Sequence, residues 1–295
     1  MRRFWLVAAV AVPLLAADAY PQQPAPNPTP QPTSQQPQRQ PSSDRPAGAD
    51  SSERGVLRVC GDPDNLPFSN EKREGFENQI AALLARELGD SLVYTWWPQR
   101  RGFVRNTLRA RECDVILGVP GGFDPVLETK PYYRSTYYLV SRTDRKLRVA
   151  SLDDPRLRKL KIAVNMIGED YTNTPPAHAL GARGIPVVGF STFYNAEHRP
   201  EDIVNAVAKG NVDVAIVWGP LAGYFAKRAP VPLTLVPLPD SVDRTGYPFA
   251  YDIAVGVRRS DKGLRARIED VLDRKRAEIA KILEDYNVPL LARRQ

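Results

Sequence analysis

The feature that most limits the possible folds is a strand pattern that occurs twice. Residues 112–118 read ECDVILG and residues 211–219 read NVDVAIVWG. Each is a short, almost continuously apolar run, which is typical of a strand buried on both faces of a sheet. An earlier pair, LRVC (57–60) and LKIAV (160–164), repeats in the same order. We therefore predict two lobes of similar construction.

Amphipathic helical segments alternate with these strands, so the pattern is that of an α/β fold with a parallel sheet and crossover helices. Strands are expected at 57–60, 91–97, 113–118, 160–164, 211–219 and 251–257, and helices at 76–89, 101–111, 200–209 and 264–286.

The N-terminus has the features of an exported protein. Residues 1–19 begin with Arg2 and Arg3, continue with a short apolar run and end in small residues, which is the pattern of a cleaved signal peptide, cut here after Ala19. The apolar run is shorter than the ~20 residues of a membrane-spanning helix; an uncleaved anchor is the alternative. Residues 20–54 are rich in proline and glutamine. We predict a disordered spacer there, with a proline-rich docking motif as the alternative.

Composition narrows the classes of partner and cofactor. The formal net charge of +7 favours an anionic or acidic partner. Nucleic acid is excluded because the basic residues are spread through amphipathic segments without a basic arm or a binding motif. Two histidines and two cysteines that form no cluster indicate no zinc-type site, and we predict neither a metal nor a cofactor for this chain.

The two cysteines, in an oxidising compartment, raise the question of a disulfide. Cys60 ends its predicted strand and Cys113 precedes its own. In parallel neighbouring strands this places them at opposite ends of the sheet, about four residues apart at ~3.3 Å each, beyond the ~7 Å limit for bridged Cα atoms. The sequence therefore predicts no Cys60–Cys113 disulfide.

Four segments resemble landmarks of the type II periplasmic solute-binding proteins: GFENQIAALLARELG, CDVILG, YDIAVGVRRSD and ILEDYNVP. The resemblance implies a two-lobed α/β fold with an interlobe cleft. Residues 55–144 and 241–295 would form lobe one, and residues 145–240 lobe two.

A more specific resemblance covers residues 57–289. The blocks LRVCGDPDNLPFSNEKREGFENQIA, YTWWPQRRGFVRNTL and PYYRSTYYLVSRTDR are similar to the MxaJ/XoxJ family of methanol oxidation. The resemblance implies a periplasmic, non-enzymatic accessory protein that docks on a PQQ-dependent methanol dehydrogenase and aids its maturation or activation. A calcium-type and a lanthanide-type dehydrogenase remain equally open as the partner.

Ligands of open parallel sheets bind beyond the carboxyl ends of the strands. Three loops of lobe one lie there, at 61–70, 97–101 and 119–124. The candidate ligand- or partner-binding residues are Asp62, Asp64, Asn65, Phe68, Trp97, Arg100, Arg101, Phe123, Tyr171 and Trp218.

The charged anchors of amino-acid receptors are missing. Amino-acid binders of the resembling fold carry an arginine for the ligand carboxylate and an aspartate for its ammonium. Alignment puts Gly122 and Trp218 at these positions. An unpaired charge in a dehydrated cleft is strongly disfavoured, so free amino acids are not expected ligands.

The stretch YTWWPQRRGF (94–103) combines tryptophan with arginine, two residue types that are enriched where one protein buries the surface of another. Adjacent strand residues point to opposite faces, so we expect Trp96 in the core and Trp97, Arg100 and Arg101 on a docking surface. Arg101, Arg105 and Arg109 are spaced as one helix face. A solvated face and a surface that steers an acidic partner are both compatible with that stripe.

Two further chemistries are disfavoured. Asp62, Asp64 and Asn65 lack the glycine and distal glutamate of an EF-hand, so a turn-forming role is preferred over a calcium or lanthanide site. Glu74 and Glu77 are the candidate carboxylates of a cleft hydrolase or lyase, but no nucleophile–base pair or metal motif accompanies them. The remaining alternative is the receptor of an ABC transporter for a small solute that is not an amino acid.

Overall fold

The computed structural model describes residues 55–147, 149, 151–167 and 173–292. The predicted signal peptide, the proline- and glutamine-rich tract and Tyr171 lie outside these residues. The strands are β1 (Val56–Gly61), β2 (Asp64–Asn65), β3 (Ser69–Asn70), β4 (Ser91–Trp96), β5 (Val115–Pro120), β6 (Leu127–Glu128), β7 (Tyr133–Arg142), β8 (Ile162–Met166), β9 (Val187–Ser191), β10 (Val214–Trp218), β11 (Leu233–Pro237) and β12 (Ala250–Val257). The helices are α1 (Phe76–Leu88), α2 (Phe103–Asn106), α3 (Pro175–Gly181), α4 (Asp202–Ala208), α5 (Gly219–Arg228), α6 (Lys262–Arg274) and α7 (Arg276–Asp285), and 3-10 turns lie at Thr143–Arg145 and Pro155–Lys159.

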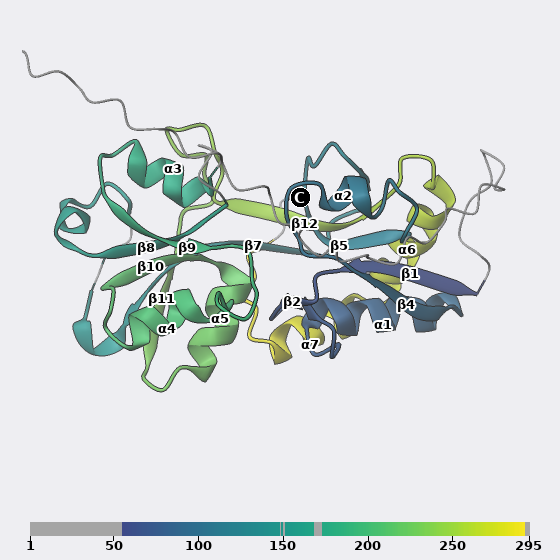
Figure 1. Cartoon of the computed structure of the whole chain (residues 1–295), viewed down its shortest axis with the longest axis horizontal. Helices are drawn as coiled ribbons and strands as arrows, with labels where there is room; N and C mark the ends of the chain where they lie inside the picture. Colours follow the sequence, from purple (N-terminus) through teal and green to yellow (C-terminus); the bar gives the residue numbers. More distant parts are fainter. Residues whose placement is uncertain (1–54, 148, 150, 168–172, 293–295) are drawn as a thin grey trace, which may run out of the picture. The chain divides into compact units, whose positions relative to one another are not determined.

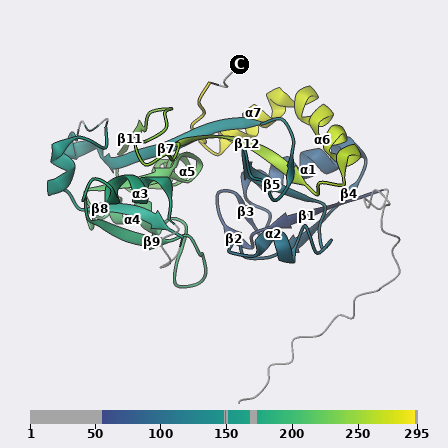
Figure 2. The same cartoon turned by 90° about the horizontal axis from the view of Figure 1, so that it is seen from above.

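The predicted α/β class is confirmed, and the sheet is mixed rather than parallel throughout. Its strand order is β4-β1-β5-β12-β7-β10-β8-β9, with β11 beside β7 and β6 beside β12. The two ends are parallel, β4-β1-β5 and β10-β8-β9. Strands β12 and β7 are antiparallel to their neighbours and join the two ends (Figures 1 and 2).

The long strand β7 belongs to both halves of the sheet. Tyr133–Thr136 pair with β12, whereas Tyr137–Arg142 pair with β10 and β11. We call the part built on β4, β1, β5 and β12 lobe one, and the part built on β10, β8, β9 and β11 lobe two. The predicted lobe boundaries near residues 145 and 240 remain predictions.

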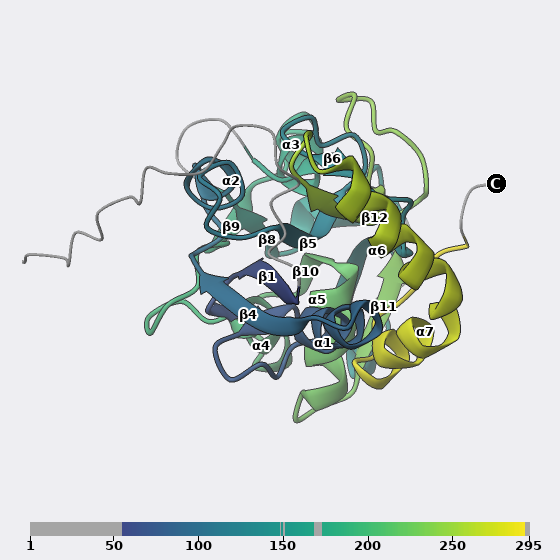
Figure 3. The same cartoon turned by 90° about the vertical axis from the view of Figure 1, so that its right-hand side faces the viewer.

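Each lobe has apolar clusters on both faces of its sheet because strand side chains alternate between faces. In β10, Val214 and Ile216 pack with α3, while Ala215 and Val217 pack with α4 and α5. In lobe one, α1 packs against α6 and α7 (Figure 3) and covers the large core cluster, and α2 lies over a smaller cluster on the opposite face.

Helix predictions were right where the caps are clear. Helix α1 ends at Gly89, whose φ of 72° is the left-handed conformation of a helix C-terminus. The helix predicted at 101–111 is only the short α2, because Gly102 (φ 91°) precedes its first turn and Thr107 (φ −120°, ψ −84°) leaves the helical conformation after Asn106. The helix predicted at 264–286 is broken at Lys275 into α6 and α7.

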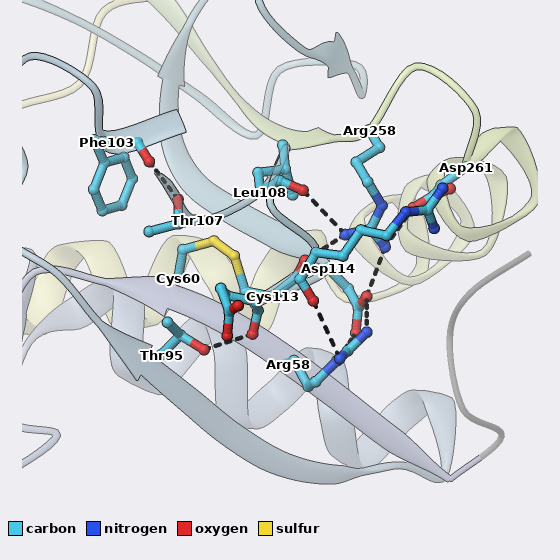
Figure 4. The surroundings of a disulfide bond; sticks show 12 residues. Arg58, Cys60, Thr95, Phe103, Thr107, Leu108, Cys113, Asp114, Arg258 and Asp261 are labelled. Atoms are coloured by element: carbon cyan, nitrogen blue, oxygen red, sulfur yellow. Dashed lines mark hydrogen bonds and ion pairs between the residues drawn. A yellow bond between two sulfur atoms is a disulfide. The ribbon is translucent and has the colours of Figure 1, made fainter. Parts of the chain in front are cut away.

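The prediction that the two cysteines are unbridged is wrong: Cys60 and Cys113 form a disulfide with a Cα–Cα distance of 5.5 Å (Figure 4). The register argument holds inside the strands, where Cys60 faces Ile116. It fails because the residues before Val115 do not continue the line of β5. The backbone carbonyl of Glu112 accepts a hydrogen bond from Thr95, the β4 partner of Cys60, so this segment crosses back over the end of β1.

Candidate functional site

A cavity of about 710 Å³ lies between the two lobes, at the carboxyl ends of their parallel strands. Lobe one contributes Asn65, Phe68, Gln99, Arg100, Arg101 and Pro120. Lobe two contributes Tyr137, Asn165, Ile167, Thr174, Thr192, Phe193, Tyr194, Trp218 and Leu221.

Five of the residues proposed from the sequence line this cavity: Asn65, Phe68, Arg100, Arg101 and Trp218. Phe123 lines a second cavity, which lies in lobe one. Asp62, Asp64 and Trp97 are not among the lining residues of either cavity.

Asp62 holds the loop that carries the two arginines. Its carboxylate accepts hydrogen bonds from the backbone N–H of Asp64 at 2.9 Å and of Gln99 at 2.5 Å. Asn65 also donates to the side chain of Gln99, at 3.2 Å. Burial raises the pKa of Asp62, the two backbone hydrogen bonds oppose this, and the charge of Asp64 adds to it. The predicted turn-forming role agrees with these contacts, which fix the backbone next to Arg100.

Asp64 lies at the surface and forms an ion pair of 3.6 Å with Arg199 of lobe two. Both side chains are substantially exposed, so this pair contributes little to stability. No group of three or more histidine, cysteine, aspartate or glutamate side chains suited to a metal ion occurs in the part of the chain that the structure describes.

The two adjacent tryptophans differ from their predicted roles. Trp96 is half-buried and stacks on Tyr94, with ring centroids 4.4 Å apart, over the surface left free by Gly61. Trp97 points to the other face and packs against the cluster around the disulfide. The expectation that Trp96 lies in the core was therefore wrong. Trp97 packs against the disulfide cluster, and its part in a docking surface stays a prediction.

Replacing Trp97 with alanine is expected to lower the free energy of unfolding by about 2 kcal/mol, less than for a fully buried aromatic because Trp97 is half-buried. Urea denaturation of the variant measures this loss. Phe123→Ala is the control: Phe123 is 36% exposed, so its loss should cost less than about 1 kcal/mol. Equal stability of wild type and Trp97→Ala would contradict the packing role.

Aromatic side chains of lobe two dominate the cavity wall. Trp218 lies between Tyr137 and Tyr251, with ring centroids at 5.3 Å and 6.0 Å. Burial raises the pKa of Tyr137 and Tyr194, so both phenols stay neutral and available as hydrogen-bond partners. Sequence reasoning missed both tyrosines. Tyr137 lies in β7, where strand alternation was an available signal, whereas Tyr194 follows β9, a strand that was not predicted.

The positions of the missing amino-acid anchors are consistent with the sequence argument. A Cβ at Gly122 would have no neighbour within 4 Å, and Trp218 presents an indole to the cavity. Among the described lining residues there is no carboxylate, and the charged groups are the exposed arginines 100 and 101. The described wall therefore provides aromatic surface and cations, but no carboxylate to pair with an ammonium group.

The two glutamates considered as catalytic carboxylates lie apart from the cavity wall. Glu74 accepts a hydrogen bond from Asn70 at 2.8 Å. Glu77 lies against Gly118: a Cβ at Gly118 would be 2.3 Å from its Oε1. Burial, and then the negative charge of Asp62, raise the pKa of Glu77 to about 8.

No helix within the described ranges is long and apolar enough to cross a membrane.

Comparisons with known proteins identify several relatives. No family model matches the chain. The protein MoxJ of Methylorubrum extorquens is 31% identical over 260 residues, which are 83% of this chain and 85% of the relative. Among solved structures, the periplasmic binding protein XoxJ from Methylobacterium extorquens AM1 is 36% identical with a TM-score of 0.66, over 81% of this chain and all of that one. MxaJ from Methlophaga aminisulfidivorans is 28% identical with a TM-score of 0.69, over 80% of this chain and all of that one.

Proposed function

The chain belongs to the MoxJ family, which shares the fold of periplasmic binding proteins, and from this premise we propose that it is an accessory protein of a PQQ-dependent methanol dehydrogenase. In this role it is exported to the periplasm, with its signal peptide cut after Ala19, and docks on the dehydrogenase to aid its maturation or activation. It carries no cofactor and catalyses no reaction of its own.

One observation supports this proposal most strongly. The described wall of the interlobe cavity presents aromatic rings and two exposed arginines where receptors for amino acids need paired charges. Aromatic and arginine side chains are enriched where proteins bury partners. The hydrogen bonds from Gln99 to Asp62 and from Asn65 to Gln99 hold the arginine loop in place before a partner arrives, which reduces the entropy cost of docking.

The test has two steps. The mature protein is first used to capture its partners from periplasm, and binding of the purified dehydrogenase to the mature protein is then measured by surface plasmon resonance. The double reversal Arg100→Glu/Arg101→Glu is expected to slow association by about tenfold and to weaken its salt dependence, because exposed charges mainly set encounter rates. Thermal unfolding should change little, since exposed substitutions usually shift stability by about 0.5 kcal/mol or less.

A matched control is Lys72→Glu/Lys262→Glu, which makes the same change in net charge at exposed positions that line neither cavity. Normal association of the control beside slowed association of the arginine variant supports docking at the cavity. Absence of any complex with the wild-type protein would reject the proposed function.

The second candidate is a receptor of an ABC transporter for a small solute other than an amino acid. It is favoured by the cavity volume of about 710 Å³, which is in the range of small-molecule sites. A thermal-shift panel of solutes separates the two candidates, since a ligand at 100 times its Kd adds about 2.7 kcal/mol of stability. Neighbouring dehydrogenase genes or neighbouring permease genes discriminate them independently.

A further inference from the structure

A second cavity, of about 450 Å³, lies wholly within lobe one between the segment 99–109 and the end of β5. Its floor is apolar and includes the buried side chains of Phe103, Ile116 and Val119. Its rim is basic: the exposed side chains of Arg100, Arg101, Arg105 and Arg109 all line it. We call this cavity with its four arginines the basic groove.

The helix-face argument that first linked three of these arginines was wrong, because α2 spans only Phe103–Asn106. The turns on either side of α2 nevertheless bring Arg101 and Arg109 to the same cavity as Arg105. The clustering is thus a property of the loop and not of a long helix.

Three of the four arginines of the basic groove lack an acidic partner among the described residues. No aspartate or glutamate is among its described lining residues. Arg100, Arg105 and Arg109 form no ion pair with any residue that the structure describes. Asp124, beside the lining residue Phe123, is engaged by Arg259 at 2.5 Å. Three such cations beside a low-dielectric floor favour an anionic occupant.

The floor is rigidly supported from below. Phe103, Ile116 and Val119 belong to the same apolar cluster as the Cys60–Cys113 disulfide. A preformed surface of this kind lowers the cost of ordering on binding.

We propose that the basic groove binds an acidic segment of a partner protein, with carboxylates at the arginines and an apolar side chain on the floor. The four arginines are exposed and spread along a rim, whereas small-molecule sites enclose most of their ligand. The basic groove also shares Gln99, Arg100, Arg101 and Pro120 with the interlobe cavity, so an elongated occupant can continue from one cavity into the other. The inference rests on the proposed function only for the identity of the partner.

The test uses a fluorescent synthetic peptide in which glutamate alternates with leucine, and measures its binding to the full-length mature protein by anisotropy. Arg105→Glu/Arg109→Glu is expected to weaken binding by about tenfold or more, because it reverses two contacting charges. Phe123→Ala should weaken it about threefold by removing part of the apolar wall. Lys72→Glu/Lys262→Glu, with the same change in net charge, should leave the affinity within about twofold, since neither lysine lines the groove and exposed charges that make no contact with a ligand are screened by salt.

Three results would overturn the proposal. The first is that the peptide does not bind at all. The second is that the lysine control weakens binding as much as the groove variant does. The third is that a peptide of alternating glutamate and serine binds as tightly as the leucine peptide. Binding to vesicles that contain anionic lipid, abolished by Arg105→Glu/Arg109→Glu while the peptide fails to bind, would assign the basic groove to a lipid surface instead.

The dehydrogenase is measured in parallel, which separates this inference from the proposed function. Peptide binding that depends on the groove, without any dehydrogenase binding, would retain the basic groove and reject the proposed partner. Dehydrogenase binding that Arg105→Glu/Arg109→Glu leaves unchanged would retain the partner and reject the basic groove as its docking site.

Discussion

Replacing Cys60 and Cys113 together with alanine is expected to lower the free energy of unfolding by about 4 kcal/mol. The two residues are 53 positions apart, and the bridge removes much of the conformational freedom that this loop has in the unfolded chain. Alanine is chosen because both cysteines are buried in an apolar cluster, where a serine hydroxyl would lack solvation.

Part of the local structure should survive the loss of the bridge. The segment from Leu108 to Asp114 is also held by Arg258, which donates to the backbone carbonyl of Cys113 and pairs with the buried Asp114 at 2.7 Å (Figure 4). Arg58 pairs with the same carboxylate at 2.8 Å. We therefore expect a folded but less stable double variant at low temperature.

Urea denaturation of the wild-type protein with and without reductant, beside the double variant, tests this prediction. Reductant should destabilise the wild type by a similar amount and leave the variant unchanged. A non-reduced mass equal to the reduced mass, or a wild type insensitive to reductant, would show that the bridge is not formed.

The missed disulfide shows where sequence reasoning reached its limit. The apolar pattern predicted β1, β4, β5, β8, β10 and β12 but not β7, β9 or β11, and Cys60 lies near the end of β1 as expected. The path of the chain before β5 depends on contacts that no local pattern encodes, such as the hydrogen bond from Thr95 to the carbonyl of Glu112. Two other results in this region also differ from the sequence prediction: α2 is short, and Trp97 packs on the disulfide cluster.

The candidate site was predictable mainly in lobe one, and in lobe two only Trp218 was found. Asn65, Phe68 and Arg100 follow strands that were recognised, so the rule for the carboxyl ends of strands located them. Phe193 and Tyr194 follow β9. That strand reads VVGFS: its apolar run is interrupted by Gly189, and it was not recognised from the sequence, so its loop was not assigned.

The second large effect concerns Glu77, whose carboxyl is held between α1 and the end of β5. It lies against Gly118, which has a φ of 72° and no side chain to displace it. Tyr132 and Tyr133 are close by: burial first, and then the charge of Glu77, raise the pKa of both phenols. Glu77 forms no ion pair with any residue in the described part of the chain.

The pKa of about 8, against 4.5 for an ordinary glutamate, fixes the direction of the pH dependence. Below pH 4.5 the carboxyl is protonated in the folded and the unfolded states, and its contribution to stability is fully present. Between pH 4.5 and 8 the unfolded chain releases the proton while the folded protein keeps it, so stability falls as the pH rises. Each pH unit in this window corresponds to about 1.4 kcal/mol, and the total loss reaches up to about 5 kcal/mol above pH 8.

Glu77→Gln should remove this dependence because the amide stays neutral at every pH. We expect the variant and the wild type to have similar unfolding free energies at pH 4.5, and the variant to be more stable by several kcal/mol at pH 8.5, up to about 5 kcal/mol. Urea denaturation across this pH range measures the difference, and the exposed Glu71→Gln is the control, expected to stay within about 0.5 kcal/mol of wild type throughout. A difference between Glu77→Gln and wild type that stays constant with pH would show that Glu77 ionises normally in the folded protein, with water or a cation reaching its carboxylate.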